Sequence, residues 1–427
     1  MFKEDFLHYI WKYKLFSTEK LLTTQKERVV ILNSGEHNFN SGSDFFNAKL
    51  EIDNQLWAGN VEIHIKSSDW YVHGHEKDSN YDNTILHVVW QHDINVYRKD
   101  NSVIPTLVLE SYIQKDILNN YLQLFSSQRK WINCENDINN INEFQFSNWL
   151  ERLYIERLEE KSKLIKRLLL DSKNDWEAVL FKMLAKNFGL KVNGDAFFNL
   201  ANQLEYSVIR KQSHSLIALE ALLFGQSNLL DEDIQDSYYI DLQTEYNFLK
   251  SKYQLTNNEN IAVQFFRLRP NNFPTIRIAQ LAALFSQKQN LFSKIIAVSN
   301  VKEYYEIFDI SVSSFWKTHY SFTSQSKKSQ KKLTKPFIDL LLINTIIPLK
   351  FMYLKSIDKL NETEIIDIVT ELKPEKNSII DKFNQLGVTS KSSLETQALL
   401  QLKNNYCEKQ KCLECVVGKS LISKNCN

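Results

Sequence analysis

The chain is poor in glycine and proline, with only 9 Gly and 6 Pro in 427 residues, against usual shares of about 7% and 5%. Because these two residues interrupt helices and strands, their scarcity predicts long regular elements, mainly helices. The chain is otherwise 43% hydrophobic, with 26 Phe, 18 Tyr and 8 Trp. This composition excludes intrinsic disorder, and the length allows two or three domains.

An excess of charge is also lacking, since the formal net charge is +1. No overall field therefore favours nucleic acid or a membrane, although a local basic patch can still do so. The first residues, MFKEDFLHYIWKYKLF, lack the uninterrupted apolar core of a signal peptide. The most apolar run, residues 337–351, is too short to span a bilayer and contains Asp339 and Lys350. We expect a soluble, cytoplasmic protein that does not enter a membrane; the sequence is silent on its oligomeric state.

The hydrophobic pattern changes along the chain. A helix is predicted at residues 3–14, and strands at residues 28–32, 45–52, 56–66, 84–90 and 103–109. The run at residues 85–90 is apolar apart from His87, which predicts a central strand that is covered on both faces. From about residue 111 the pattern is helical, and Asp175 or Asn174 is expected to cap a helix that ends at Phe188. We therefore expect an α+β fold, with a mixed-sheet domain at residues 1–135 and a helical domain at residues 136–427.

Histidine is concentrated in the predicted sheet domain. Six of the nine histidines lie within 56 residues: His37, His64, His73, His75, His87 and His92. Seven acids accompany them: Glu36, Asp44, Glu62, Asp69, Glu76, Asp78 and Asp82. Imidazole and carboxylate groups are the usual protein ligands of divalent metals. The cluster favours a metal site, the alternative being that each histidine has a structural role.

Residues 61–66 alternate, which places Glu62, His64 and Lys66 on one face of a strand. With Asp44 upstream, this arrangement resembles the PD-(D/E)XK nuclease core, in which an Asp and an acid-X-Lys motif meet across a hairpin. The resemblance implies that Asp44 and Glu62 hold Mg²⁺ or Mn²⁺, while His64 or Lys66 positions water or stabilises charge. His64 stands where lysine is expected. The alternative is an amphipathic strand with a solvated polar face.

The predicted pairing of the two strands raises a problem of register. A hairpin that turns at residues 53–56 pairs Glu62 with Asn47 and turns Asp44 to the opposite face. We therefore expect either a one-residue bulge at Ala58 and Gly59 or a loop that aims Asp44 at Glu62. Another alternative is a cupin, because the sequence His-Gly-His at residues 73–75 is similar to the paired histidines of that fold.

Three cysteines crowd the C-terminal segment. Cys407, Cys412 and Cys415 form the pattern C-x4-C-x2-C. Thiolates at this spacing suit Zn²⁺ or an iron–sulfur cluster. Either Cys134 or Cys426 would be the fourth ligand, and the alternative is three cysteines without a metal.

Two basic segments are candidates for phosphate contacts. Arg267, Arg269 and Arg277 surround two prolines, and a stiff loop of this kind can hold nucleic-acid phosphates bidentately. The alternative is a loop that buried interactions tie to the fold. Lysines crowd residues 327–335, where we expect an exposed loop that is able to add phosphate affinity.

Several stretches together resemble a family of uncharacterised bacterial proteins, domain of unknown function 2851: FLHYIWKYKLF, GEHNFNSGSDFFNA, LWAGNVEIHIKSSDW, FRLRPNNFPTIR and YCEKQKCLECVVG. The resemblance runs from end to end and implies no particular activity. From the residues, the first hypothesis is a metal-dependent, nuclease-like phosphodiesterase that acts on nucleic acid. The second is a non-catalytic binding or scaffold protein with a degenerate nuclease-like core. The third is a metal-dependent hydrolase of another substrate.

Overall fold

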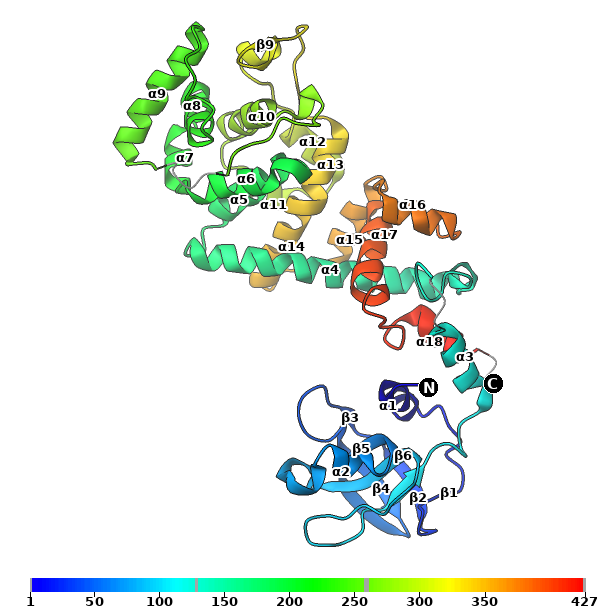
Figure 1. Cartoon of the computed structure of the whole chain (residues 1–427). Coiled ribbons are helices and arrows are strands. Elements are labelled where there is room, and N and C mark those ends of the chain that lie inside the picture. Colours follow the sequence, from blue (N-terminus) through cyan, green and yellow to red (C-terminus); the bar gives the residue numbers. More distant parts are fainter. Residues whose placement is uncertain (1, 127–129, 257–260, 425–427) are drawn as a thin grey trace. The chain divides into compact units, whose positions relative to one another are not determined.

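The computed structural model describes residues 2–126, 130–256 and 261–424 (Figure 1). It divides into two compact units, which we call unit 1 (residues 1–146 and 403–427) and unit 2 (residues 147–402). The chain is 53% helical and 12% strand, and all strands but one short hairpin lie in unit 1, so the predicted α+β class is confirmed. The sequence had grouped the C-terminal segment with the helices, whereas its contacts place residues 403–424 in unit 1.

Unit 1 is built on a seven-stranded sheet with the order β1-β2-β4-β5-β6-β7, in which β3 also pairs with β4. Its strands are β1 (Leu21–Leu22), β2 (Arg28–Asn33), β3 (Glu36–His37), β4 (Phe45–Ile52), β5 (Gln55–Lys66), β6 (Thr84–Gln91) and β7 (Thr106–Val108). β4 and β5 form an antiparallel hairpin, while β5–β6 and β6–β7 are parallel. The cupin alternative is wrong, because cupins are antiparallel jelly rolls.

Short helices surround this sheet. They are α1 (Glu4–Tyr13), α2 (Asp69–Val72), η1 (His75–Lys77), η2 (Ser79–Tyr81), α3 (Lys115–Leu124), η3 (Ile138–Asn140), η7 (Leu402–Cys407, from the last residue of unit 2) and α18 (Val416–Ile422). β6 is buried over its first six residues, as expected of a central strand. α1 packs against β5 and buries Phe6, Leu7 and Ile10.

The β4–β5 hairpin contains a one-residue bulge, as is needed to bring Asp44 and Glu62 to the same face. The bulge lies in β4, whereas the sequence predicted it in β5. Ala48 pairs with Gly59 and Phe45 pairs with Val61, so the extra residue is in β4. Asn47 adopts a φ of 56° there, a conformation that Asn tolerates better than most residues. The prediction of a bulge at Ala58 and Gly59 is therefore wrong. Gly59 is needed for another reason, because a Cβ at this position would lie 2.4 Å from Cγ2 of Ile85 on β6.

The C-terminal segment completes unit 1. α18 lies beside α3 (Figure 1). The side-chain amide of Asn120 on α3 donates to the carbonyl oxygens of Ile422 at 3.2 Å and Lys424 at 3.0 Å. Val417 and Ile422 are fully buried. Residues from the two ends of the sequence therefore share one core.

In its described residues, unit 2 is helical apart from the small β8–β9 hairpin (His319–Ser321 and Ser324–Gln325). Its helices are α4 (Glu143–Asp171, beginning just before the unit boundary), α5 (Trp176–Phe188), α6 (Leu190–Asn202), α7 (Tyr206–Gln212), α8 (Leu216–Gln226), α9 (Ser237–Tyr253), η4 (Pro270–Asn272), α10 (Pro274–Gln287), α11 (Leu291–Ala297), α12 (Val301–Ile307), η5 (Phe315–Lys317), α13 (Lys335–Leu341), η6 (Leu342–Ile346), α14 (Ile347–Ser356), α15 (Glu362–Glu371), α16 (Ser378–Gln385) and α17 (Ser393–Gln401). The predicted cap of α5 is confirmed, since Asp175 accepts a hydrogen bond of 3.0 Å from the amide of Ala178.

The most apolar run lies in a longer helix than expected. α13, η6 and α14 continue into one another from Lys335 to Ser356, 22 residues that are long and apolar enough to cross a membrane by length and composition. The expectation that the run is too short is therefore wrong, because a π-helical turn carries the helix past Pro348. The apolar window is 67% buried within the protein. Lys350 in this helix is also buried and forms an ion pair of 2.7 Å with Glu364.

Candidate metal site

One cluster of acids and histidines lies on unit 1. It contains Glu4 and His8 of α1, Asp44 before β4, Glu62 and His64 of β5, His73 after α2, His75 of η1 and His87 of β6. The structure thus brings together three of the predicted site residues, Asp44, Glu62 and His64. The parallel neighbour β6 and the turn after α2 add three histidines that the sequence analysis had placed in the same cluster.

Asp44 and Glu62 face each other across the β4–β5 hairpin. The backbone amide of Asp44 donates to Oε2 of Glu62 at 3.2 Å, and the amide of Ile63 donates to Oδ2 of Asp44 at 2.9 Å. Glu62 is only 4% exposed. The bulge at Asn47 removes the register problem, so the two carboxyl groups lie on the same side of the sheet.

Three imidazoles converge beside Glu62. Potential ligand atoms of His64, His73 and His75 all lie within 4.8 Å of one another. Nε2 of His64 is 3.1 Å from Nδ1 of His73, and Oε1 of Glu62 is 3.2 Å from Nε2 of His75. A divalent ion bonded at about 2.0–2.2 Å to nitrogen and oxygen ligands needs them roughly this close. The three histidines can hold one ion with the Glu62 carboxyl beside them, and the exposed side chain of His73 leaves the site open to solvent.

His87 supports this group from the interior of the sheet. Its Nε2 lies 2.8 Å from Nδ1 of His64, and its side chain is fully buried. For Nε2 of His64 to bind a metal, the ring proton must be on Nδ1, from which it is donated to His87. Metal-binding histidines usually have such an acceptor behind them, because it fixes the tautomer and the orientation of the ring. His87 therefore lies where it can fix the orientation of the His64 ring.

The electrostatics of the cluster favour neutral imidazoles. Burial, followed by the neighbouring histidines, lowers the pKa of His64 to about 2 and that of His87 to about 3. Burial, with the nearby charge of Asp44, raises the pKa of Glu62 to about 9. The ring of His64 is thus neutral and able to bind a cation at neutral pH. Glu62 is protonated at neutral pH and would lose its proton when a cation binds beside it.

Glu4 and His8 are site residues that the sequence did not predict. Nε2 of His8 lies 3.3 Å from Oδ2 of Asp44 and 3.9 Å from Oε1 of Glu4. Burial lowers the pKa of His8, but the Asp44 carboxylate outweighs burial and raises it overall. Burial raises the pKa of Glu4 to about 7. The i,i+4 spacing of Glu4 and His8 in the first helix was the available signal, although only the fold brings that helix to the hairpin.

Lys66 lies apart from the buried cluster. It is exposed at the end of β5, and its backbone amide donates to Asp69 at 2.9 Å. Of the two residues that could replace the lysine of the nuclease-like motif, His64 is the one in contact with Glu62, at 3.7 Å.

The predicted phosphate contacts lie in unit 2. Arg277 is buried, and its guanidinium donates to Gln280 at 2.9 Å and Asn272 at 2.6 Å while lying over the ring of Phe337. These contacts give Arg277 the structural role that the sequence left as its alternative. Arg267 and Arg269 are exposed.

The lysine-rich segment after β9 is only partly the exposed loop that was expected. Lys331 is buried, and its ammonium group donates to the carbonyl oxygens of Trp316 and His319, both at 2.6 Å. The expectation of an exposed side chain is wrong for Lys331. Its charge can be buried because these two carbonyl oxygens accept hydrogen bonds from its ammonium group. Lys327 and Lys328 remain available to solvent or phosphate.

The cysteines form a second cluster in unit 1. Cys134 and Cys415 are buried and Cys407 and Cys412 are half-buried. Cys426, the other candidate for a fourth ligand, lies outside the described residues.

These observations define an α+β protein with a helical unit and a mixed-sheet unit that carries acids, histidines and thiols. The profile of the family described as "Protein of unknown function (DUF2851)" matches residues 4–378, so the chain belongs to this family. No curated protein and no solved structure matches the chain.

Replacing His87 tests its positioning role. We expect His87→Leu to weaken divalent-metal binding by about 10–100-fold, as is usual when the hydrogen-bond partner of a metal ligand is lost. His87→Gln, whose side-chain oxygen can still accept from His64, should recover part of that affinity. Isothermal titration with Mn²⁺ or Zn²⁺ measures both variants. Unchanged affinity in His87→Leu would remove His87 from the site.

Proposed function

We propose that the protein is a metal-dependent, nuclease-like phosphodiesterase acting on nucleic acid. The observation that carries this proposal is the meeting of Asp44 and Glu62 across a hairpin, beside the nitrogen ligands of His64, His73 and His75. Two acids and a cation are the usual means of hydrolysing a phosphodiester, because the developing charge is large and the attacking water must be activated.

The donor set favours particular metals. Imidazole-rich sites suit Zn²⁺ and other transition metals, whereas carboxylate oxygens suit Mg²⁺ and Mn²⁺. A site with three imidazoles and one or two carboxylates therefore favours Mn²⁺ or Zn²⁺ over Mg²⁺. When bound, such an ion would polarise the phosphoryl group and lower the pKa of a bound water.

The chain itself supplies orientation and charge. The amide of Ile63 and the ring of His8 hold the Asp44 carboxylate from two sides, at 2.9 Å and 3.3 Å. His8, whose pKa is raised, can keep a proton beside Asp44 and offer positive charge to a phosphate. Arg267 and Arg269 are further candidates for phosphate contacts.

A non-catalytic binding or scaffold protein is the second candidate. It is favoured by the histidine that replaces the expected lysine and by the exposed position of Lys66. A metal-dependent hydrolase of another substrate would use the same site, so the choice of substrates must separate the three.

The test is a cleavage assay on the purified full chain after chelation. We expect single- or double-stranded DNA to be cut with Mn²⁺ or Zn²⁺, and not with a chelator. His64→Ala should lose both cleavage and metal uptake. The control is His214→Ala, which removes an exposed histidine of unit 2 and should retain both.

Each outcome decides between the candidates. Metal uptake without cleavage of DNA, RNA or a small chromogenic phosphodiester would support the scaffold. Cleavage of the small diester alone would support another hydrolase. Metal uptake by His64→Ala equal to that of the wild type would refute the site itself.

A further inference from the structure

Four cysteines of unit 1 come together from two distant parts of the sequence. Cys134 lies between α3 and η3, Cys407 ends the π-helical segment η7, and Cys412 and Cys415 precede α18. No disulfide joins them. A π-helical turn is rare and frequently occurs at a functional site.

Packing around the cysteines holds these segments together. The side-chain amide of Asn133 donates to Sγ of Cys412 at 3.4 Å. The ammonium group of Lys403 lies 5.2 Å from the ring centre of Trp131. α18 is also tight against the turn that carries the thiols, because a Cβ on Gly418 would lie 2.1 Å from the carbonyl oxygen of Cys412.

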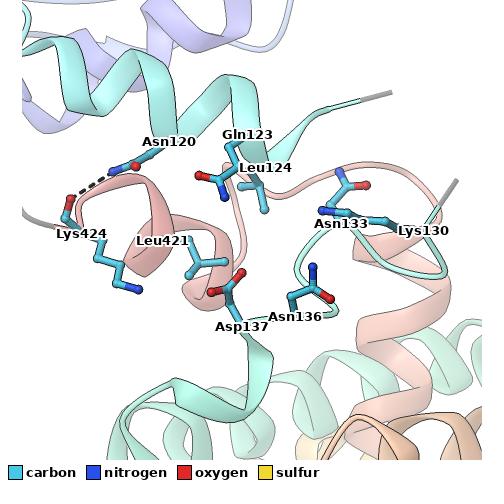
Figure 2. A pocket seen from close by; sticks show the side chains of 9 residues that line it. All are labelled: Asn120, Gln123, Leu124, Lys130, Asn133, Asn136, Asp137, Leu421 and Lys424. Carbon is cyan, nitrogen blue, oxygen red and sulfur yellow. Dashed lines mark hydrogen bonds between the residues drawn. The ribbon is translucent and has the colours of Figure 1, made fainter. Parts of the chain in front are cut away.

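A cavity shows how the three segments meet. It has a volume of about 240 Å³ and is enclosed by α3, the loop at residues 130–137 and α18. In Figure 2, Asn133 and Asn136, which flank Cys134 in sequence, lie on the loop side, and Leu421 faces them from α18. The loop of Cys134 and the helix that follows Cys415 are thus neighbours in one small region.

The thiols influence one another. Burial raises the pKa of Cys134, and the thiolates of Cys407, Cys415 and Cys412 raise it further. Burial likewise raises the pKa of Cys412 to about 11, although the amide of Asn133 acts in the opposite direction. The geometry points the same way, because Asn133, which precedes Cys134, donates an N–H···S hydrogen bond to Cys412 and so brings the fourth cysteine to the C-x4-C-x2-C segment. Four thiols gathered in this way are the ligand set of a metal centre.

Spacing distinguishes two kinds of centre. A single Zn²⁺ with bonds of about 2.3 Å to sulfur needs its sulfurs roughly 3.8 Å apart. Among the described residues, the trio of ligand atoms within 4.8 Å of one another belongs to histidines, and no three of the thiols form such a trio. The core of an iron–sulfur cluster separates its cysteine ligands, and C-x4-C-x2-C with a distant fourth cysteine is a known cluster spacing.

We propose that Cys134, Cys407, Cys412 and Cys415 bind an iron–sulfur cluster that fastens residues 403–424 to the loop at residues 130–137. The proposal is independent of the phosphodiesterase function. The two segments that carry the ligands are separated in the sequence by the whole of unit 2. The cluster would therefore add a second long-range link to the contact that the short helix α18 makes with α3. Metal-binding free energy of this kind becomes folding free energy.

The test uses the full chain purified without oxygen. We expect iron and acid-labile sulfide in equal amounts, together with a visible absorption that bleaches on reduction with dithionite. Cys134→Ser should lose most of the iron. Cys426→Ser is the matched control and should retain it.

Other results would overturn the proposal. They are zinc without sulfide, no bound metal, or a loss of iron in Cys426→Ser but not in Cys134→Ser. If Cys134→Ser fails to fold, limited proteolysis of the wild type replaces it. Oxidative removal of the cluster should then expose residues 403–424 to cleavage, and unchanged protection would contradict the proposal. Iron content does not depend on nuclease activity, so the two proposals can fail separately.

Discussion

Glu62→Gln is expected to abolish metal-dependent cleavage and, at the same time, to make the metal-free protein more stable at alkaline pH. The amide cannot supply a negative charge to a cation, so activity should fall by at least about 100-fold. The amide also resembles the protonated acid that the buried site prefers, because burial raises the pKa of Glu62 to about 9. A residue kept only for folding would not give these opposite effects.

The direction of the pH dependence follows from proton linkage. The pKa of Glu62 rises from 4.5 in the unfolded chain to about 9 in the folded one, so its stabilising contribution is complete below pH 4.5 and is lost as the pH rises towards 9. The lowered pKa values of His64 and His87 change the unfolding free energy only below about pH 6.5, where these two histidines bind protons in the unfolded chain but not in the folded one. Burial lowers the pKa of Lys161 in unit 2 to about 7, so this lysine also acts between pH 7 and 9, with the opposite sign. The contribution of Glu62 is therefore read as the difference between the wild type and Glu62→Gln.

Chemical denaturation of metal-free protein at pH 7 and pH 9 measures this effect. Over this range the wild type should lose roughly 1–3 kcal/mol more unfolding free energy than Glu62→Gln, since each pH unit contributes up to about 1.4 kcal/mol. The control is Glu110→Gln, at an exposed position of unit 1, which should behave as the wild type. An identical pH slope in Glu62→Gln would show that the acid is already ionised in the folded protein.

Ending the chain after Leu402 is expected to unfold unit 1 and to leave unit 2 folded. The deletion removes the buried side chains of Val417 and Ile422 and opens the face of α3 that they cover. Each such side chain contributes about 1.5–3 kcal/mol of burial, so these two alone contribute roughly 3–6 kcal/mol. A loss of this size is comparable with the whole stability of many domains.

Hydrogen exchange, read separately for the two units, distinguishes the possible outcomes. The amides of β5 and β6 should lose their protection in the truncated chain, while those of α5 and α10 keep it. A milder pair of variants controls for the deletion: Val417→Ala at a buried position should destabilise unit 1, and Val416→Ala at a half-exposed one should have little effect. Full protection of β5 after truncation would show that residues 403–424 are dispensable for unit 1.

Local pattern predicted most of the elements. The alternation of Glu62 and His64, the apolar run of β6 and the cap at Asp175 each depend on neighbours within a few residues, which a sequence displays directly. The position of the bulge could not be read in this way. The extra residue could lie at Gly59 in β5 or at Asn47 in β4. The close contact of Gly59 with Ile85 on another strand decides between these two positions.

By itself the sequence determined the α+β class, the order of strands and helices, and the gathering of histidines, acids and thiols that makes both metal proposals possible. The tertiary structure alone decided which of them meet: it brought His8 to Asp44, placed His87 behind His64, withdrew Arg277 and Lys331 into the interior, and carried Cys412 back to the loop of Cys134. The reason is that such contacts join residues tens to hundreds of positions apart. Their geometry is set by how whole strands and helices pack, for which no short stretch of sequence carries a signal.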